Sequence, residues 1–229
     1  MIKGVVFDLD HTLFDRYGTL TECAPFYYEK FKDYLAPGLE IEDVVTTLIY
    51  ADKEYIYMGE HRRVCQYLNE SGFFAKPMEP DMYVEIIFEG FRQWAVPLPF
   101  TYTVLEEIKK AGYKVGLITN GREPVQQAKI DILGIKSYFD EIIICSTPEL
   151  KKPNTLAFEI MSEKLGIPSN ELIYVGDNPK NDVDASRNAG YIPIWVNTCG
   201  QWQFDDIKRA DYEIDTVADL LEVLNKLNA

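Results

Sequence analysis

Short apolar segments alternate with helix-length segments over the last 130 or so residues of this 229-residue chain, and this alternation constrains the fold more than any other feature. Strands that alternate with helices of ten or more residues form βαβ units, whose strands are parallel and whose helices cover the sheet. We therefore expect an α/β fold with a doubly wound parallel sheet. The apolar, strand-like segments are residues 2–8, 114–119, 141–145, 172–175 and 192–196, with a weaker one at 212–214.

A different pattern separates the first of these strands from the rest. Residues 16–94 contain amphipathic helical segments and no convincing strand. The sequence thus predicts an α/β core formed by residues 1–15 and 95–229, with an all-helical domain of residues 16–94 inserted after the first strand. Right-handed crossovers predict the strand order 3-2-1-4-5. Ligands bind such sheets at the carboxyl ends of the strands beside the topological switch, so the inserted block is expected to lie over the site as a lid.

Two acidic residues, Asp8 and Asp10, follow the first strand, and Thr12 comes two residues later. Side chains at i and i+2 of an extended segment point the same way, so the two carboxylates repel each other unless a cation lies nearby. A hard divalent cation with oxygen ligands is the simplest such partner. The alternative is a solvated turn, since Asp, Thr and His are common turn residues.

Three further polar clusters stand where later strands end or the next helices begin. They predict a shared site, because the carboxyl ends of parallel strands meet at one edge of the sheet. The clusters are Thr119-Asn120-Gly121, then Lys151-Lys152-Pro153, then Gly176-Asp177 with Asn181 and Asp182.

In order and spacing, these clusters resemble the four motifs of the haloacid dehalogenase-like hydrolases. The matching patterns are Asp-x-Asp-x-Thr, Thr-Asn-Gly, Lys-Pro and Gly-Asp-x-x-x-x-Asp, and they extend over essentially the whole core. The helical insert is similar to that family's type-one cap. The resemblance implies a Rossmann-like core and a Mg²⁺-dependent phosphatase that acts on a small phosphorylated metabolite.

The resemblance also implies roles for the first motif. Asp8 would be the nucleophile that attacks the phosphoryl group and becomes an aspartyl phosphate. Asp10 would protonate the leaving alcohol and then take a proton from the hydrolytic water. Thr12 is expected to fix the loop by hydrogen bonding.

The metal ligands implied by the resemblance are Asp8, the backbone carbonyl of Asp10, and Asp177, with Asp182 holding a metal-bound water. These oxygen ligands suit Mg²⁺. The ion would bridge the nucleophile and the phosphate and neutralise charge between them.

The second and third motifs are expected to bind the phosphate. Thr119 offers a hydroxyl group, and Asn120 and Gly121 offer backbone N–H groups. Lys152 would place its charge on the phosphate and the nucleophile, with Lys151 as the rival. We prefer Lys152 because the family's lysine usually precedes the proline directly.

Other functions share parts of this pattern. Dehalogenases of the family have an aromatic residue where this chain has Asp10, which favours phosphoryl chemistry. A phosphonate hydrolase needs a cap lysine, and nothing singles one out among Lys30, Lys32 and Lys53. A sugar-phosphate mutase shares the core and stays an alternative. A phospho-accepting signalling domain is a non-enzymatic alternative, although it would need neither Asp10 nor an inserted cap.

Composition narrows the partners and the location. The net charge of −14 disfavours nucleic-acid polymers and anionic membrane surfaces. The start of the chain does not resemble a signal peptide and no apolar run has the length of a membrane span, so we expect a cytoplasmic protein.

Two histidines and four widely spaced cysteines (Cys23, Cys65, Cys145 and Cys199) predict buried free thiols and no zinc site. The residues considered for substrate contact, each interpreted first as a solvated surface group, are Arg16, Tyr17, His61, Arg62, Arg63 and Arg122.

Overall fold

The computed structural model describes residues 1–55, 61–198, 202 and 204–228. Its internal contacts divide the chain into two compact units, Met1–Asp15 with Pro97–Ala229, and Arg16–Val96. We describe each unit by itself. The function of the second unit as a cap stays a prediction.

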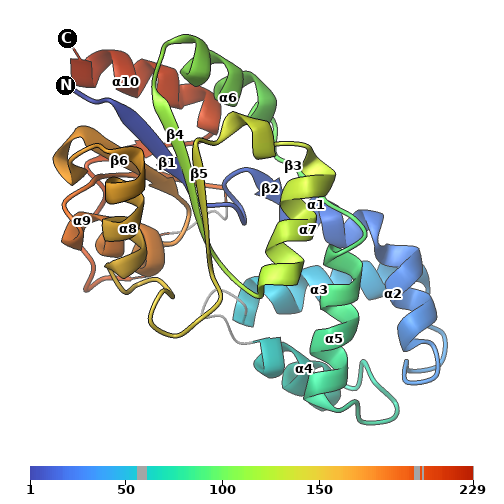
Figure 1. Cartoon of the computed structure of the whole chain (residues 1–229). Coiled ribbons are helices and arrows are strands. Elements are labelled where there is room, and N and C mark those ends of the chain that lie inside the picture. The colour runs from blue at the N-terminus through green and yellow to red at the C-terminus, as the bar shows by residue number, and fades with distance from the viewer. Residues whose placement is uncertain (56–60, 199–201, 203, 229) are drawn as a thin grey trace. The chain divides into compact units, whose positions relative to one another are not determined.

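The first unit is built on a six-stranded parallel sheet with the order β5-β4-β1-β6-β7-β8. The predicted order 3-2-1-4-5 is therefore confirmed, and the weak strand at 212–214 extends the sheet at its edge. In Figure 1, β1 lies between β4 and β6, with β5 beyond β4. The strands are β1 (Gly4–Phe7), β4 (Lys114–Asn120), β5 (Glu141–Cys145), β6 (Leu172–Gly176), β7 (Ile192–Val196) and β8 (Tyr212–Ile214).

Helices cover both faces of this sheet. On one face, the buried side chains Val6, Ile118 and Tyr174 pack with Phe158 and Met161 of α8 in a single hydrophobic cluster. Residues of the opposite parity, such as Val5 and Phe7, are also fully buried, as the alternation of side chains along a strand requires. The helices of this unit are α6 (Thr101–Lys110), α7 (Glu123–Leu133), α8 (Leu156–Leu165), α9 (Ala185–Asn188) and α10 (Leu220–Asn228), with 3₁₀ turns η2 (Lys136–Tyr138), η3 (Ser169–Glu171) and η5 (Val217–Asp219).

The strand register places the end of β1 beside the ends of its two neighbours. Phe7 pairs with Leu117 of β4 on one side and with Val175 of β6 on the other. The backbone N–H of Asp8 continues the ladder by donating to the Val175 carbonyl at 2.9 Å. The residues that follow β1, β4 and β6 therefore meet at one edge of the sheet, at its topological switch.

The segment after β6 is not one continuous α-helix. It forms a π-helical turn, η4 (Pro179–Asp184), followed by the short helix α9. The side chain of Asn178 caps the turn by accepting from the N–H groups of Lys180 and Asn181 at 3.1 and 2.9 Å. The Asn178 carbonyl also accepts from the N–H groups of Asp182 and Val183. The bond to Val183 spans five residues, as in a π-helix, and the spacing of apolar residues in the sequence does not predict it.

The second unit is helical, and its core is rich in aromatic residues. Tyr27, Phe31 and Tyr83 stack in succession, with ring centroids 6.1 and 5.9 Å apart. Arg16, which the sequence suggested to be a solvated group, is instead buried and pairs with Asp52. Its helices are α1 (Arg16–Glu22), α2 (Ala24–Phe31), α3 (Ile41–Tyr55), α4 (His61–Glu70) and α5 (Pro80–Phe91); short strands β2 (Phe14–Asp15) and β3 (Val96–Pro97) stand where the chain leaves and re-enters the first unit.

Three of the four cysteines lie in the described part of the chain. Cys23, Cys65 and Cys145 are buried free thiols, as predicted, whereas Cys199 lies outside the described residues. No helix among the described residues has the length and hydropathy needed to cross a membrane.

Candidate active site

A buried lysine stands at the centre of the predicted site. The Nζ atom of Lys152 lies 2.7 Å from Oδ1 of Asp8 and 2.6 Å from Oδ1 of Asp182, and the side chain is 2% exposed. It also donates to the Tyr174 hydroxyl at 2.7 Å. Burial lowers the pKa of Lys152, but the charges of Asp182 and Asp8 outweigh that effect and keep it well above its usual range. The residue before it, Lys151, is exposed.

Three buried carboxyl groups gather around this lysine. One oxygen each of Asp8, Asp177 and Asp182 lie within 4.8 Å of one another. One ammonium group cannot balance three buried carboxylates, so the cluster keeps a surplus of negative charge. Because all the donor atoms are hard oxygens, this set fits a divalent ion such as Mg²⁺.

The pKa of Asp8 reflects its burial first and the neighbouring charges second. Burial of its carboxyl group raises the pKa of Asp8 to about 7; the charge of Lys152 opposes this rise, and that of Asp182 adds to it. A cation bound between these carboxylates would favour the ionised, nucleophilic form.

The turn η4 and the glycine before it position the acids that follow β6. The Oδ2 atom of Asp182 accepts from the N–H of Asn178 at 2.9 Å, which holds the side chain back against the strand end. A Cβ atom on Gly176 would lie 2.5 Å from that carboxyl group, so only glycine leaves room for it. The carbonyl of Asp177 accepts from the Trp195 indole N–H at 2.6 Å.

The carboxylate of Asp10 has different partners, and two of them come from α7. The Lys129 ammonium donates to its two oxygens at 2.7 and 3.0 Å, and the Gln126 amide donates to Oδ2 at 2.9 Å. The sequence analysis did not identify Lys129 or Gln126. The signal was present, however, because both positions share the helical face of the buried Val125 and Ile130, where polar residues are unusual.

The second motif lies at the end of β4. The Thr119 hydroxyl is buried and accepts from the Gln126 amide at 2.6 Å, so its own O–H is the proton it can offer. The Asn120 side chain pairs with the backbone of Lys152 in both directions, at 2.9 and 3.0 Å, and thereby fixes the lysine loop. The sequence motif predicts a role only for the backbone of Asn120, so this side-chain role is an additional finding. Gly121 has φ of +154°, where a side chain would also meet Gln126.

The loop after β1 is not held in the way we expected. The Thr12 hydroxyl is fully buried and makes no hydrogen bond within the described structure, so the predicted fixing role is wrong. Backbone N–H groups of Leu13 and Phe14 hold the loop instead by donating to the Leu9 carbonyl, both at 2.9 Å. His11 adopts a left-handed φ of 57°, and its carbonyl accepts from Thr198.

The remaining residues considered for substrate contact have partners of their own or lie at the surface. Arg62 is exposed and pairs with Asp81, and His61 packs edge-on against Phe88. Lys53 lies over the ring of Tyr17 at 4.9 Å. Arg63 and Arg122 are exposed. Substrate contact by any of them stays a prediction.

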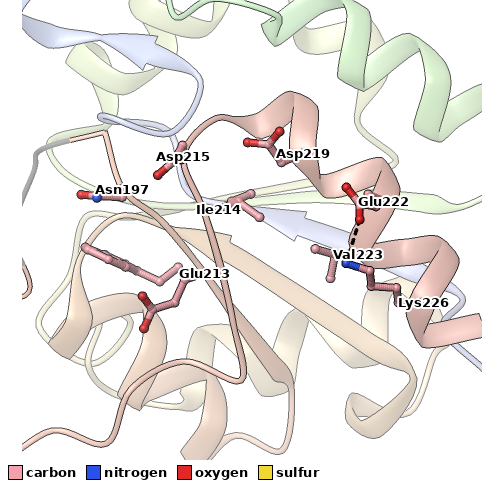
Figure 2. A pocket seen from close by; sticks show the side chains of 9 residues that line it. Asn197, Glu213, Ile214, Asp215, Asp219, Glu222, Val223 and Lys226 are labelled. Carbon is pink, nitrogen blue, oxygen red and sulfur yellow. Dashed lines mark ion pairs between the residues drawn. The ribbon is translucent and has the colours of Figure 1, made fainter.

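Figure 2 shows a hollow elsewhere in the first unit, formed by β7, β8 and α10. Four of the nine residues that line it are acidic, and Lys226 pairs there with Glu222 at 2.8 Å. None of the predicted site residues lines this hollow. We therefore place the candidate site at the ends of β1, β4 and β6.

Comparisons with known proteins identify the family of the chain. Residues 5–196 match the family model of haloacid dehalogenase-like hydrolases. The chain is 29% identical to the glyceraldehyde 3-phosphate phosphatase of Methanocaldococcus jannaschii, over 99% of each chain. It is 27% identical to the phosphoglycolate phosphatase of Vibrio parahaemolyticus, over 97% of this chain and 96% of that protein. The fold is similar to that of the HAD-hydrolase YfnB from Bacillus subtilis bound to magnesium, with a TM-score of 0.72 and 19% identity over 98% and 99% of the two chains. The chain belongs to the haloacid dehalogenase-like hydrolases.

Proposed function

We propose that this protein hydrolyses the phosphate monoesters of small metabolites through an aspartyl phosphate on Asp8. One observation carries the proposal. The buried carboxylates of Asp8, Asp177 and Asp182 and the buried ammonium of Lys152 converge where β1 and β6 end. Such a cluster can hold both a cation and a phosphate group beside one nucleophile. The phosphatase names of the relatives point the same way.

In the first step, an Asp8 oxygen attacks phosphorus and the P–O ester bond breaks. The ester oxygen keeps the bonding electron pair and takes the proton of the Asp10 carboxyl group, so the alcohol leaves neutral. In the second step, water attacks the phosphorus of the aspartyl phosphate while Asp10 takes a proton from it. The bond to Asp8 breaks, and inorganic phosphate leaves.

The other site residues bind and orient the phosphate. Lys152 offers positive charge beside the nucleophile, and the Thr119 hydroxyl and the backbone N–H groups of Asn120 and Gly121 donate hydrogen bonds. Asp8, Asp177, Asp182 and the Asp10 carbonyl would hold Mg²⁺, which when bound neutralises charge between the carboxylates and the phosphate.

The Asp8→Asn variant tests the proposal. We expect the wild type to hydrolyse para-nitrophenyl phosphate with Mg²⁺ and to lose this activity with a chelator. The variant should lose more than about a thousandfold in kcat, because the nucleophile is gone. Asp33→Asn, an exposed acid in the second unit, is the matched control. Circular dichroism checks that both variants fold, and a folded Asp8→Asn variant with full turnover contradicts the covalent mechanism.

A substrate screen refines the proposal. The relatives' names suggest that glyceraldehyde 3-phosphate and phosphoglycolate should be included with sugar phosphates and nucleotides. We further propose that the unit Arg16–Val96 acts as a cap domain that selects among such substrates. The cytoplasmic location and the absence of a nucleic-acid partner stay predictions from the sequence.

A further inference from the structure

We propose that Lys129 and Gln126 are positioning residues, which hold the Asp10 carboxylate in place for both proton transfers. This inference rests on the proposed function and extends it to residues outside the four motifs. Both residues lie on α7 and are 2% exposed, and they approach Asp10 from more than 110 positions further along the chain.

The contacts fix both oxygens of the Asp10 carboxylate. Lys129 donates to Oδ1 at 2.7 Å and to Oδ2 at 3.0 Å, and Gln126 donates to Oδ2 at 2.9 Å. The second amide proton of Gln126 is used as well, because the same nitrogen lies 2.6 Å from the Thr119 hydroxyl. The amide therefore links the general acid to the phosphate-binding strand end.

Lys129 is more deeply buried than Asp10, its partner in the ion pair. The side chain of Lys129 is 3% exposed, whereas that of Asp10 is 26% exposed. The ammonium also lies 4.4 Å from the centre of the buried Phe14 ring, which closes another side of it. The cation thus contacts the carboxylate from the protein interior, and the carboxylate keeps a solvent-accessible side for a substrate or a water molecule.

Stability alone does not account for this arrangement. Burying a charged pair stabilises a fold little, and apolar side chains in its place are often at least as stable. The positions on either side of this helical face, Val125 and Ile130, are apolar and buried. A chemical reason is available instead, because the first step leaves Asp10 as a carboxylate. Lys129 and Gln126 stabilise that product and hold it for the second step.

The position of the Gln126 side chain requires a glycine at position 121. A Cβ atom at position 121 would lie 2.7 Å from Cγ of Gln126 and 2.9 Å from Cδ. The absent side chain at Gly121 therefore leaves room for Gln126 to reach Asp10, in addition to any contact with phosphate.

The test uses the dependence of the first step on the leaving group. Phenolate needs protonation as it departs, whereas para-nitrophenolate is a weaker base and needs it less. Single-turnover release of the phenol is measured by rapid mixing with excess full-length enzyme and Mg²⁺. For Lys129→Met we expect the rate of phenol release from phenyl phosphate to fall about a hundredfold. The rate for para-nitrophenyl phosphate should fall only about tenfold. Gln126→Leu should show the same selectivity with a smaller loss.

Controls separate the possible failures. Lys136→Met changes an exposed side chain just after α7, and Gln127→Leu changes a half-buried side chain on α7 that pairs with Asp131. Both variants should leave the two rates unchanged. Lys129→Arg, which keeps the charge, should recover part of the phenyl phosphate rate. If Lys129→Met does not fold, Gln126→Leu carries the test. Equal losses for the two substrates, or none, overturn the positioning role, whereas a wild type that cleaves neither substrate contradicts the proposed function itself.

Discussion

At the scale of single residues, surroundings decide what a side chain of a given type can do. Lys151 and Lys152 are adjacent, yet the first is exposed and the second contacts two carboxylates inside the protein. Asp8 and Asp10 lie two positions apart, yet the first contacts Lys152 and the second contacts Lys129. The two acids could be identified in the sequence. That each of them pairs with a different lysine could not.

Asp140 gives a residue-scale prediction on stability. Its carboxylate accepts from the Val115 N–H at 2.9 Å, from Lys114 at 2.9 Å and from Lys109 at 3.1 Å. Burial raises the pKa of Asp140, but these hydrogen bonds outweigh it and lower the pKa to about 2. Since this value is below that of an unfolded chain, the carboxylate stabilises the fold above about pH 4, and the contribution disappears as pH falls toward about 2.

The Asp140→Asn variant measures this contribution. We expect its free energy of unfolding to be lower than that of the wild type by about 2 kcal/mol at neutral pH. The difference should shrink to about half near pH 3 in urea titrations of both proteins. A difference that stays constant between neutral pH and pH 3 would show that the ionised form of Asp140 is not the cause.

At the scale of elements, charged residues can lie on the buried faces of helices, where an amphipathic pattern predicts apolar ones. Arg16 of α1 donates two hydrogen bonds to Asp52 of α3, both at 2.8 Å, and lies 4.6 Å from the centre of the Phe91 ring of α5. The sequence places Arg16 beside the first motif, where it was considered for substrate binding. The structure shows that its guanidinium joins helices of the second unit instead.

The Arg16→Met variant tests the role of this ion pair. Removing one partner leaves the buried Asp52 charge uncompensated, so we expect a loss of about 3–5 kcal/mol in the free energy of unfolding. The double variant Arg16→Met/Asp52→Leu should regain much of that loss, because no charge is then left unpaired. Urea unfolding of the three proteins gives both values, and a double variant less stable than the single one would argue against this account.

At the scale of the whole molecule, the site is the meeting point of segments that are far apart in sequence. Asp8, Lys152 and Asp182 come from three separate motifs and are joined by contacts of 2.7 Å or less. Parallel pairing of β1 with β4 and β6 makes this possible, because it brings their carboxyl ends to one edge. Most of the chain must therefore fold before the carboxylate cluster exists.

Metal binding should consequently stabilise the fold as a whole. A Mg²⁺ concentration about a hundredfold above Kd adds about 2.7 kcal/mol, which corresponds to a rise in Tm of about 5–10 °C. The Asp177→Asn variant should show a much smaller rise, measured by calorimetry at constant ionic strength. Asp33→Asn removes the same charge from an exposed position and should respond like the wild type. Equal rises in Asp177→Asn and the wild type would mean that Mg²⁺ acts only by screening the net charge of −14.

The parallel sheet, its strand order and the four polar clusters could all be predicted from the amino-acid sequence. These features depend on local periodicity and on general rules of connection, which one chain carries in full. Other features depend on how the chain packs: α7 supplies partners of Asp10, the Thr12 hydroxyl has no hydrogen-bond partner among the described residues, and η4 is a π-helical turn. The reason is physical: a contact between Asp10 and Lys129 depends on how a helix packs against a sheet, and the spacing of residues along the chain does not contain that information.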